Sequence, residues 1–278
     1  SLEAPTAAHR RLFQGLGQPP TDAEIPPANC SRPGPFSFYV SLKDDNGEHS
    51  CGGILVSDGV NSLSRWVVTS AHCIDDLANP NAVFLPEVDI AGRRRDEPIE
   101  TLTTVESVLH PDWSGDRSEG NDIAVLKLSN TSCYRFPVPL AEEDFTISVN
   151  GTAQFVSFGR EVADGGFSAQ LQAGSWDVIG REDCEEEYIE DDTELTDSMM
   201  CSRGMNVVGM CQGDEGSPLV WFPNFDSPGG KDPFAKRILG IASFSDVEDC
   251  QSPDGVAIFT SVAKMNKWIN ETIFDLFE

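Results

Sequence analysis

From Phe36 onward the chain consists of short β-rich runs separated by turn residues, and this spacing limits the possible folds more than any other feature. The runs read FSFYVSL, CGGILVS, RWVVTSA, NAVFLP, VESVLH, IAVLKL, AQFVSFG, SPLVWF, RILGIASF and VAIFTSV. Many short strands at such intervals are typical of an all-β barrel or sandwich. Only the C-terminus differs, where Val262, residues 267–269 and residues 273–277 predict an amphipathic terminal helix.

Eight cysteines between Cys30 and Cys250 lack the paired spacing of a zinc site, so we expect disulfides and an oxidising compartment. Four glycosylation sequons, at Asn29, Asn130, Asn150 and Asn270, agree with a secreted, extracellular glycoprotein. The chain begins at Ser1 without a charged segment and an apolar core, so we expect any signal peptide to have been removed.

The net charge of −27 excludes nucleic acids and anionic membrane surfaces as partners, because both would be repelled. The sequence has no apolar stretch that approaches the roughly 18 residues needed to span a bilayer. Nine of the thirteen residues in 182–194 are acidic, which indicates either a solvated loop or helix face or a docking patch for a basic partner or cations. Residues 59–65 and 223–236 are expected to be exposed loops.

Several motifs occur in an order that resembles the chymotrypsin and trypsin family. The sequence CGGILV from Cys51, followed by TSAHC ending at Cys73, is similar to the family's histidine motif, and NDIAVL from Asn121 is similar to its aspartate motif. The segments DSMMC and CQGDEGSPL, and the strand GIASF, resemble those around the nucleophile and the substrate cleft.

The resemblance implies two packed six-stranded antiparallel β-barrels with a C-terminal helix, over residues 25–278. Residues 1–24, rich in Pro, Gly and Ala, then form an N-terminal extension or vestigial pro-segment. The resemblance also implies the disulfides Cys51–Cys73, Cys184–Cys201 and Cys211–Cys250. Cys30 and Cys133 remain, and we pair them by elimination.

The resemblance assigns His72 as the catalytic imidazole, Asp122 as its carboxylate partner, Ser243 as the serine that binds this aspartate, and Gly213 as an oxyanion donor. The family's nucleophile motif is Gly-Asp-Ser-Gly-Gly-Pro, but here the serine is replaced by Glu215. A carboxylate is a poor substitute for a hydroxyl nucleophile, and its charge opposes a developing oxyanion. Ser217 is an alternative nucleophile, but we expect it to miss the imidazole.

Two interpretations of the retained His72 and Asp122 stay open. They form either a buried pair that stabilises the barrel interface, or a site in which Glu215 makes an ion pair with His72 and raises its pKa. The activation apparatus is altered too, because prolines follow Ile25 where the family has glycines. We therefore predict an uncut, zymogen-like chain with a network in which Asp214 pairs with His49 and Ser41, although His49 is equally well explained as an ordinary barrel histidine.

The specificity pocket implied by the resemblance contains Gly209 at its base and Ser245 and Ala257 in its walls, which predicts a narrow, uncharged pocket. No cofactor is expected. Glu87, Asp89, Asp96 and Glu97 offer oxygen ligands near the family's calcium loop, but their spacing matches poorly, so they are only weak calcium candidates.

These observations favour a secreted serine protease homolog without catalysis that binds an extracellular protein, itself a protease or another hydrolase, as regulator, cofactor or inhibitor. A structural component of an extracellular matrix and an active endopeptidase with an atypical site remain the alternatives. Labelling by a fluorophosphonate, recovery of a stoichiometric soluble partner, or isolation from insoluble assemblies would separate the three.

Overall fold

The computed structural model describes most of the chain from Phe36 onward. The described ranges are 36–57, 64–77, 81–84, 100–132, 137–145, 151–160, 165–168, 171–188, 194–205, 209–222, 236–245 and 255–276. Several predictions fall on other residues and so lie outside the described part. They concern the extension 1–24, Ile25, Cys30, Cys133, Cys250, the sequons at Asn29 and Asn150, most of the loop 59–65, the loop 223–236 except for Lys236, which is buried, and the calcium candidates Glu87, Asp89, Asp96 and Glu97.

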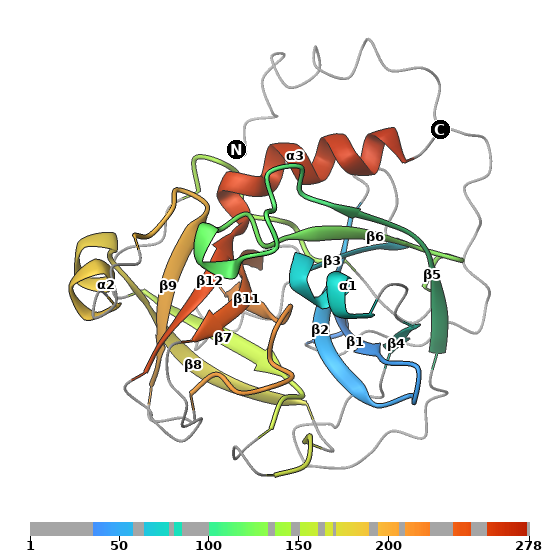
Figure 1. Cartoon of the computed structure of the whole chain (residues 1–278), viewed down its shortest axis with the longest axis horizontal. Coiled ribbons are helices and arrows are strands. Elements are labelled where there is room, and N and C mark those ends of the chain that lie inside the picture. The colour runs from blue at the N-terminus through green and yellow to red at the C-terminus, as the bar shows by residue number, and fades with distance from the viewer. Residues whose placement is uncertain are drawn as a thin grey trace, which may run out of the picture.

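Within these ranges, two closed antiparallel barrels make up the fold, as the sequence predicted (Figure 1). The first barrel has the order β1-β2-β3-β6-β5-β4. Its strands are β1 Tyr39–Lys43, β2 His49–Val56, β3 Trp66–Thr69, β4 Asn81–Phe84, β5 Glu100–Leu109 and β6 Ala124–Leu128. The short helix α1, Ala71–Leu77, follows β3, and a 3-10 turn, Arg117–Glu119, precedes β6.

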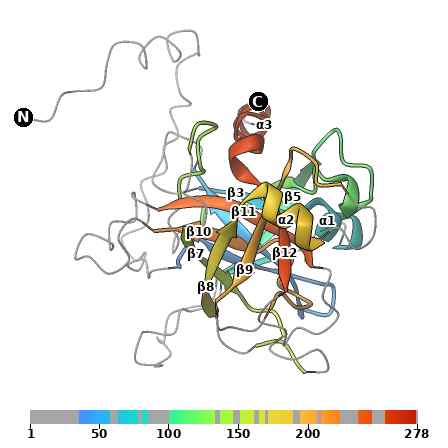
Figure 2. The same ribbon diagram turned by 90° about the vertical axis from the view of Figure 1, so that its left-hand side faces the viewer.

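The second barrel has the order β10-β11-β12-β9-β8-β7 and faces the viewer in Figure 2. Its strands are β7 Thr152–Ser157, β8 Gln172–Ile179, β9 Met199–Gly204, β10 Pro218–Trp221, β11 Arg237–Ser245 and β12 Val256–Ser261. Helix α2, Arg181–Tyr188, connects β8 with β9, and helix α3, Val262–Asp275, continues directly from β12. None of the described helices is long and apolar enough to cross a membrane.

Ten of these strands overlap the β-rich runs of the sequence, whereas β8 and β9 match none of them. Strand β8 reads QAGSWDVI and β9 reads MMCSRG, so Gly and Asp interrupt the apolar pattern of β8, and Arg and Gly interrupt that of β9. Their pairing with β7 and β12 provides the stabilisation that local propensity lacks. The acidic segment begins as helix α2, which buries Cys184 and exposes Glu182 and Asp183, as a solvated helix face requires.

Among the described residues, the buried apolar side chains form one cluster within each barrel, one that lies between the barrels, and a smaller one where helix α2 packs on β9 and β12. Helix α3 contributes its buried face, with Ile269 and Ile273, to the cluster between the barrels. It packs on β11, β12 and β6, and the ammonium of Lys127 on β6 donates to the carbonyl of Leu276 at 2.6 Å. The terminal helix therefore contacts both barrels, which limits how they can move relative to each other.

A backbone hydrogen bond joins the barrels where β2 approaches the turn before β10. The Gly52 amide donates to the Glu215 carbonyl at 2.7 Å, and within the first barrel the Thr69 hydroxyl of β3 donates to the Gly52 carbonyl at 2.8 Å. A methyl group on Gly52 would lie 2.9 Å from the α-carbon of Ser217 and closer still to its hydroxyl. Only glycine permits this close approach of two backbones.

Two of the expected disulfides are present, between Cys51 and Cys73 and between Cys184 and Cys201. Cys211 is also disulfide-bonded, while Cys250, its expected partner, lies outside the described residues. The Cys30–Cys133 pair stays a prediction. The first bridge fixes helix α1 to β2, and the second fixes α2 to β9, so both hold short helices against the sheets.

The substitution Gly52→Ala should lower the free energy of unfolding by about 1–3 kcal/mol, because the added methyl group overlaps Ser217 and Tyr39 at the junction of the barrels. Urea denaturation measures this change as a lower midpoint at unchanged slope. Gly166→Ala is the matched control, since its methyl group would meet no atom within 4 Å. Equal midpoints for the two variants would contradict this account of the junction.

Candidate functional site

His72 and Asp122, which the sequence proposed as an imidazole and its carboxylate partner, lie in direct contact. His72 is in the first turn of α1, and Asp122 immediately precedes β6. The carboxylate accepts hydrogen bonds from the His72 ring nitrogen Nδ1 at 2.7 Å and from the His72 backbone amide at 2.9 Å. Because Nδ1 donates its hydrogen to the carboxylate, the free lone pair of a neutral imidazole lies on Nε2, which can accept a proton.

Asp122 is almost fully buried, with 1% of its surface exposed, yet it is well supplied with donors. The Ser243 hydroxyl on β11 donates to the same carboxylate oxygen as His72. Burial alone would raise the pKa of Asp122, but the hydrogen bonds and charge of His72 and the bond from Ser243 outweigh it, and the pKa is lowered. Asp122 therefore carries a negative charge inside the protein.

Two backbone features place Asp122. Asn121 has a φ of 56°, a left-handed conformation that Asn adopts more readily than most residues, and its amide donates to the Ser198 hydroxyl at 2.9 Å. The Asp122 carbonyl accepts the Thr260 hydroxyl from β12 at 2.8 Å. Residues of the second barrel thus hold the loop that carries this carboxylate of the first barrel.

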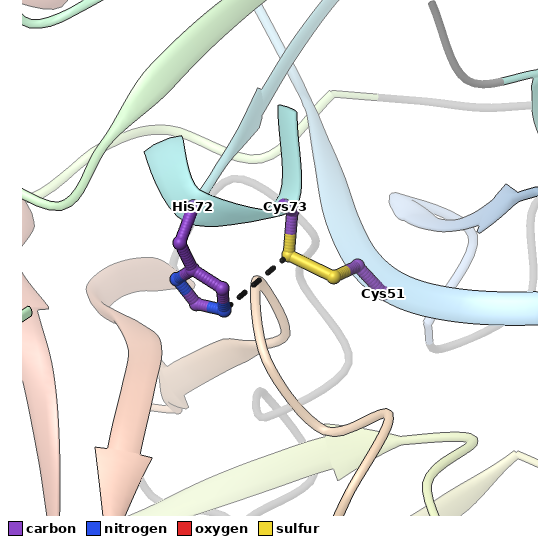
Figure 3. A group of neighbouring side chains, drawn as sticks. All are labelled: Cys51, His72 and Cys73. Carbon is purple, nitrogen blue, oxygen red and sulfur yellow. Dashed lines mark hydrogen bonds between the residues drawn. A yellow bond between two sulfur atoms is a disulfide. The ribbon is translucent and has the colours of Figure 1, made fainter. Parts of the chain in front are cut away.

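The outer nitrogen of His72 faces a disulfide (Figure 3). Nε2 lies 3.8 Å from the Sγ of Cys73, whose sulfur is bonded to Cys51. These three side chains are close enough together to surround a metal ion, but disulfide sulfur carries no thiolate charge and is a poor metal ligand. Among the described residues, no hydroxyl is hydrogen-bonded to the His72 ring.

Glu215 occupies the turn that precedes β10, which is shaped by Gly213 with φ 89° and Gly216 with φ 75°. Its carboxylate oxygen Oε2 accepts the Gly213 amide at 2.6 Å. The predicted ion pair between Glu215 and His72 is not formed among the described residues, and that interpretation is corrected. The Glu215 side chain instead reaches back two residues and accepts a charge-assisted hydrogen bond from the Gly213 amide.

Ser217, the alternative nucleophile, faces the protein interior. Its side chain is fully buried, and its hydroxyl lies 3.0 Å from the hydroxyl of Tyr39 on β1. Among the described residues, no hydrogen bond joins Ser217 to His72. Burial raises the pKa of Tyr39, so this phenol stays protonated and neutral.

Asp214 is paired differently from the prediction. Its carboxylate accepts the Ser157 hydroxyl and the Cys211 amide, the latter at 2.7 Å, and no bond joins it to His49 among the described residues. Burial, together with the neighbouring charge of Glu215, raises the pKa of Asp214 to about 7, although the bonds from Ser157 and Cys211 lower it. Ile25, whose amino group would be its partner in a cut chain, lies outside the described residues.

His49 and Ser41 do contact each other, at 2.8 Å between the hydroxyl and Nδ1. Nε2 of His49 lies 2.8 Å from the Gly213 carbonyl, which can only accept, so Nε2 carries the proton and Nδ1 accepts from Ser41. Burial lowers the pKa of His49 to about 4, despite the bond to Gly213. The predicted network therefore forms only in part, between Ser41 and His49.

The three predicted specificity-pocket residues lie on or beside the second barrel. Ser245 on β11 pairs in register with Ala257 on β12, which is buried, and Gly209 lies half-buried just before Met210. Residues 206–208 and 246–254, which neighbour these three in sequence, are outside the described ranges. The narrow, uncharged pocket therefore stays a prediction.

Sequence reasoning missed Ser157 and Tyr39, which bind Asp214 and Ser217. Both lie in β-rich runs of ordinary appearance, so no sequence signal marked them. It also missed the contact between the Glu215 side chain and the Gly213 amide, although a spacing of two residues in a glycine-rich turn could have suggested it.

Comparison with known proteins gives consistent matches. The family model described as Trypsin matches residues 28–269. Chymotrypsin-like elastase family member 1 of Bos taurus is 27% identical over 262 residues, which cover 92% of this chain and 91% of that protein. Chymotrypsin-like elastase family member 3B of Homo sapiens is 28% identical over 271 residues, with 94% of both chains covered.

Among solved structures, neuropsin, described as a serine protease expressed in the limbic system of mouse brain, superimposes with a TM-score of 0.67. The match covers 87% of this chain and 97% of neuropsin, at 23% sequence identity. At this identity the likeness supports the double-barrel fold alone.

The buried carboxylate of Asp214 should make stability depend on pH. Its folded pKa of about 7 lies above the ordinary 3.8, so its contribution is complete below pH 3.8 and is lost as the pH rises through about 7. The asparagine of Asp214→Asn cannot ionise, so the variant does not lose this stability. The free energy of unfolding of the variant minus that of the wild type should therefore increase from pH 4 to 7, by a few kcal/mol in order of magnitude.

His49 provides a comparison of opposite sign. Its folded pKa of about 4 lies below the ordinary 6.5, so its contribution is present above pH 6.5 and is lost as the pH falls through about 4. The wild type gains this stability as the pH rises over that window, and His49→Gln does not. The free energy of unfolding of the variant minus that of the wild type should therefore decrease. Denaturant titrations at several pH values measure both slopes, and parallel slopes for the two variants would contradict these assignments.

The bond between Glu215 and Gly213 predicts a specific spectroscopic change. Glu215→Ala removes a charged acceptor 2.6 Å from the Gly213 amide, so the amide proton resonance should move upfield in a proton–nitrogen correlation spectrum. Glu142→Ala is the matched control, because this exposed glutamate pairs with Arg237. If the Gly213 resonance shifts equally in both variants or in neither, the proposed bond is absent.

Proposed function

Because this chain belongs to the trypsin family of serine proteases, we propose that it is a member without proteolytic activity that binds another extracellular protein. It would act on that partner as a regulator, cofactor or inhibitor. One observation carries the proposal. Glu215 stands where the family motif has its nucleophilic serine, and its own carboxylate occupies the Gly213 amide that would stabilise an oxyanion.

The first obstacle to catalysis is the nucleophile. Peptide hydrolysis on this scaffold needs a hydroxyl whose proton passes to the imidazole as the oxygen attacks the carbonyl carbon. A carboxylate at this position would form an anhydride, which is a high-energy intermediate. Removal of the nucleophile of a serine protease costs on the order of a million-fold in rate.

The second obstacle is electrostatic. An oxyanion binds to preorganised amide protons, and each such donor is worth roughly a hundred- to a thousand-fold in rate. Here the Gly213 amide already donates to Oε2 of Glu215, so a substrate carbonyl would have to displace a charged acceptor. The remaining carboxylate charge would also repel the oxyanion that forms.

The His72–Asp122 pair then has a structural role. Asp122 accepts bonds from His72 in the first barrel and from Ser243 in the second, so the pair links the barrels across the site. The disulfides and the exposed sequon asparagines Asn130 and Asn270 support secretion, and secretion would place the partner outside the cell.

Reaction with a fluorophosphonate probe tests the loss of proteolysis, because this reagent labels only an activated serine. The wild-type chain should remain unlabelled and should not cleave peptide substrates, whereas a pancreatic elastase assayed in parallel should be labelled. Label mapped to any serine of this chain, and lost in His72→Ala, would establish the active endopeptidase that the names of the relatives suggest.

The binding role needs a separate measurement. A tagged wild-type chain and its His72→Ala variant should recover the same soluble partner at one-to-one stoichiometry from extracellular fluid, since binding does not use the imidazole. Recovery of the native protein only from insoluble or filamentous assemblies would instead favour a structural matrix component.

A further inference from the structure

Helix α3 carries one of the two described sequon asparagines on its exposed face (Figure 1). Asn270 begins the sequence Asn-Glu-Thr, which is an acceptor motif for N-linked glycans, and its side chain is exposed. The opposite face of the helix is buried in the cluster between the barrels, with Met265, Ile269 and Ile273. Asn270 is therefore presented to solvent by a helix that is fixed to both barrels.

The same face presents an exposed aromatic ring. Phe274 is 50% exposed, and it is the one aromatic residue among the exposed large hydrophobic side chains of the described ranges. Residues four apart on a helix are neighbours, with roughly 5–6 Å between their β-carbons. Helical side chains also lean toward the N-terminal end of the helix, so Phe274 leans over the turn that carries Asn270.

The Asn270 amide is already held in position. Its Nδ2 donates to the backbone carbonyl and to the side-chain oxygen of Asn266, both at 2.8 Å. Asn266 in turn donates to the Ala141 carbonyl at 2.8 Å, in the segment that connects the barrels. A glycosylated asparagine keeps one Nδ2 hydrogen, so one of these two bonds can persist and orient the first sugar.

Asn130, the other described sequon asparagine, lacks this arrangement. It is exposed in the loop after β6, where its Oδ1 accepts the Thr131 amide at 2.8 Å. Outside a helix, no residue is aligned with it at the fixed four-residue spacing. The aromatic neighbour therefore distinguishes Asn270.

We propose that Asn270 carries an N-linked glycan whose first N-acetylglucosamine packs on the ring of Phe274. A sugar suits this ring because its C–H groups pack on the π-face while its hydroxyls stay in water. The inference depends on the secretory route that the proposed function includes, and not on the loss of proteolysis. A glycan here would cover the outer face of α3 and so confine the protein partner to other faces of the molecule.

The modification is a group transfer whose donor is a lipid-pyrophosphate-linked oligosaccharide. A bond forms between Nδ2 of Asn270 and the anomeric carbon of the first sugar, and the bond from that carbon to the phosphate oxygen breaks. The lipid pyrophosphate leaves, and Nδ2 releases one of its two protons. Thr272, which completes the motif, is 8% exposed in the folded chain, so the transfer takes place before α3 packs on the barrels.

Site occupancy is measured on a tagged chain directed through the secretory pathway of a eukaryotic cell and collected from medium and cells together. Peptide-N-glycosidase in heavy-oxygen water converts each glycan-bearing asparagine to a labelled aspartate, which mass spectrometry locates. We expect label at Asn270 in most of the chain. Thr272→Val is the matched control, since it nearly keeps the side-chain shape but removes the hydroxyl of the motif, and it should leave Asn270 unlabelled.

The inference is overturned if Asn270 is mostly unlabelled, or if the label persists in Thr272→Val and so reports deamidation. A chain that reaches the medium without this glycan overturns the inference alone. A chain that carries no label and stays in the cell overturns the secretory route of the proposed function as well. Fluorophosphonate labelling judges the loss of proteolysis separately.

Packing on Phe274 is tested by NMR after an endoglycosidase has trimmed each glycan to its first sugar. The C–H resonances of the sugar on Asn270, identified by their loss in Thr272→Val, should lie upfield of those of free N-acetylglucosaminyl-asparagine, because they lie over an aromatic ring. Phe274→Leu should return them to ordinary positions, whereas Met205→Leu, at another exposed apolar position, should not. Resonances that are not upfield in the wild type, or that respond equally to both substitutions, overturn the contact.

Discussion

The buried carboxylate of Asp122 is the interaction on which the arrangement of the two barrels depends. It is charged, almost inaccessible to water, and bonded on one side to His72 and on the other to Ser243. A buried charge is tolerated only when its hydrogen-bonding capacity is filled, so the two barrels must present these donors together. This requirement holds whether or not the site performs catalysis.

The turn that precedes β10 carries two consecutive carboxylates, Asp214 and Glu215, whose environments differ. Asp214 points inward to Ser157 and the Cys211 amide, and its raised pKa reflects burial without a cationic partner among the described residues. The Glu215 side chain bends back and accepts a hydrogen bond from the Gly213 amide. Both side chains therefore accept backbone amides of one short turn, Asp214 from Cys211 and Glu215 from Gly213.

The strands with continuous apolar character could be predicted from sequence, because burial of both faces leaves a pattern that local reading detects. Strands β8 and β9 could not, since Gly, Asp and Arg obscure their pattern and their neighbours β7 and β12 supply the stabilisation. The site residues His72, Asp122 and Ser243 followed from motifs. The partners of Asp214, Glu215 and Ser217 did not, because each depends on a side-chain direction within a turn.

By itself, the sequence determined an all-β fold through its strand spacing, and its motifs indicated the double barrel and the trypsin family by resemblance, with Glu215 where the family motif has serine. Tertiary structure decided which partners the polar side chains meet. It directed Glu215 to Gly213 and away from His72, and it turned His49 to the Gly213 carbonyl. The His49 contact joins segments far apart in sequence, and the direction of Glu215 depends on the turn where the barrels meet, so both are fixed only when both barrels are packed.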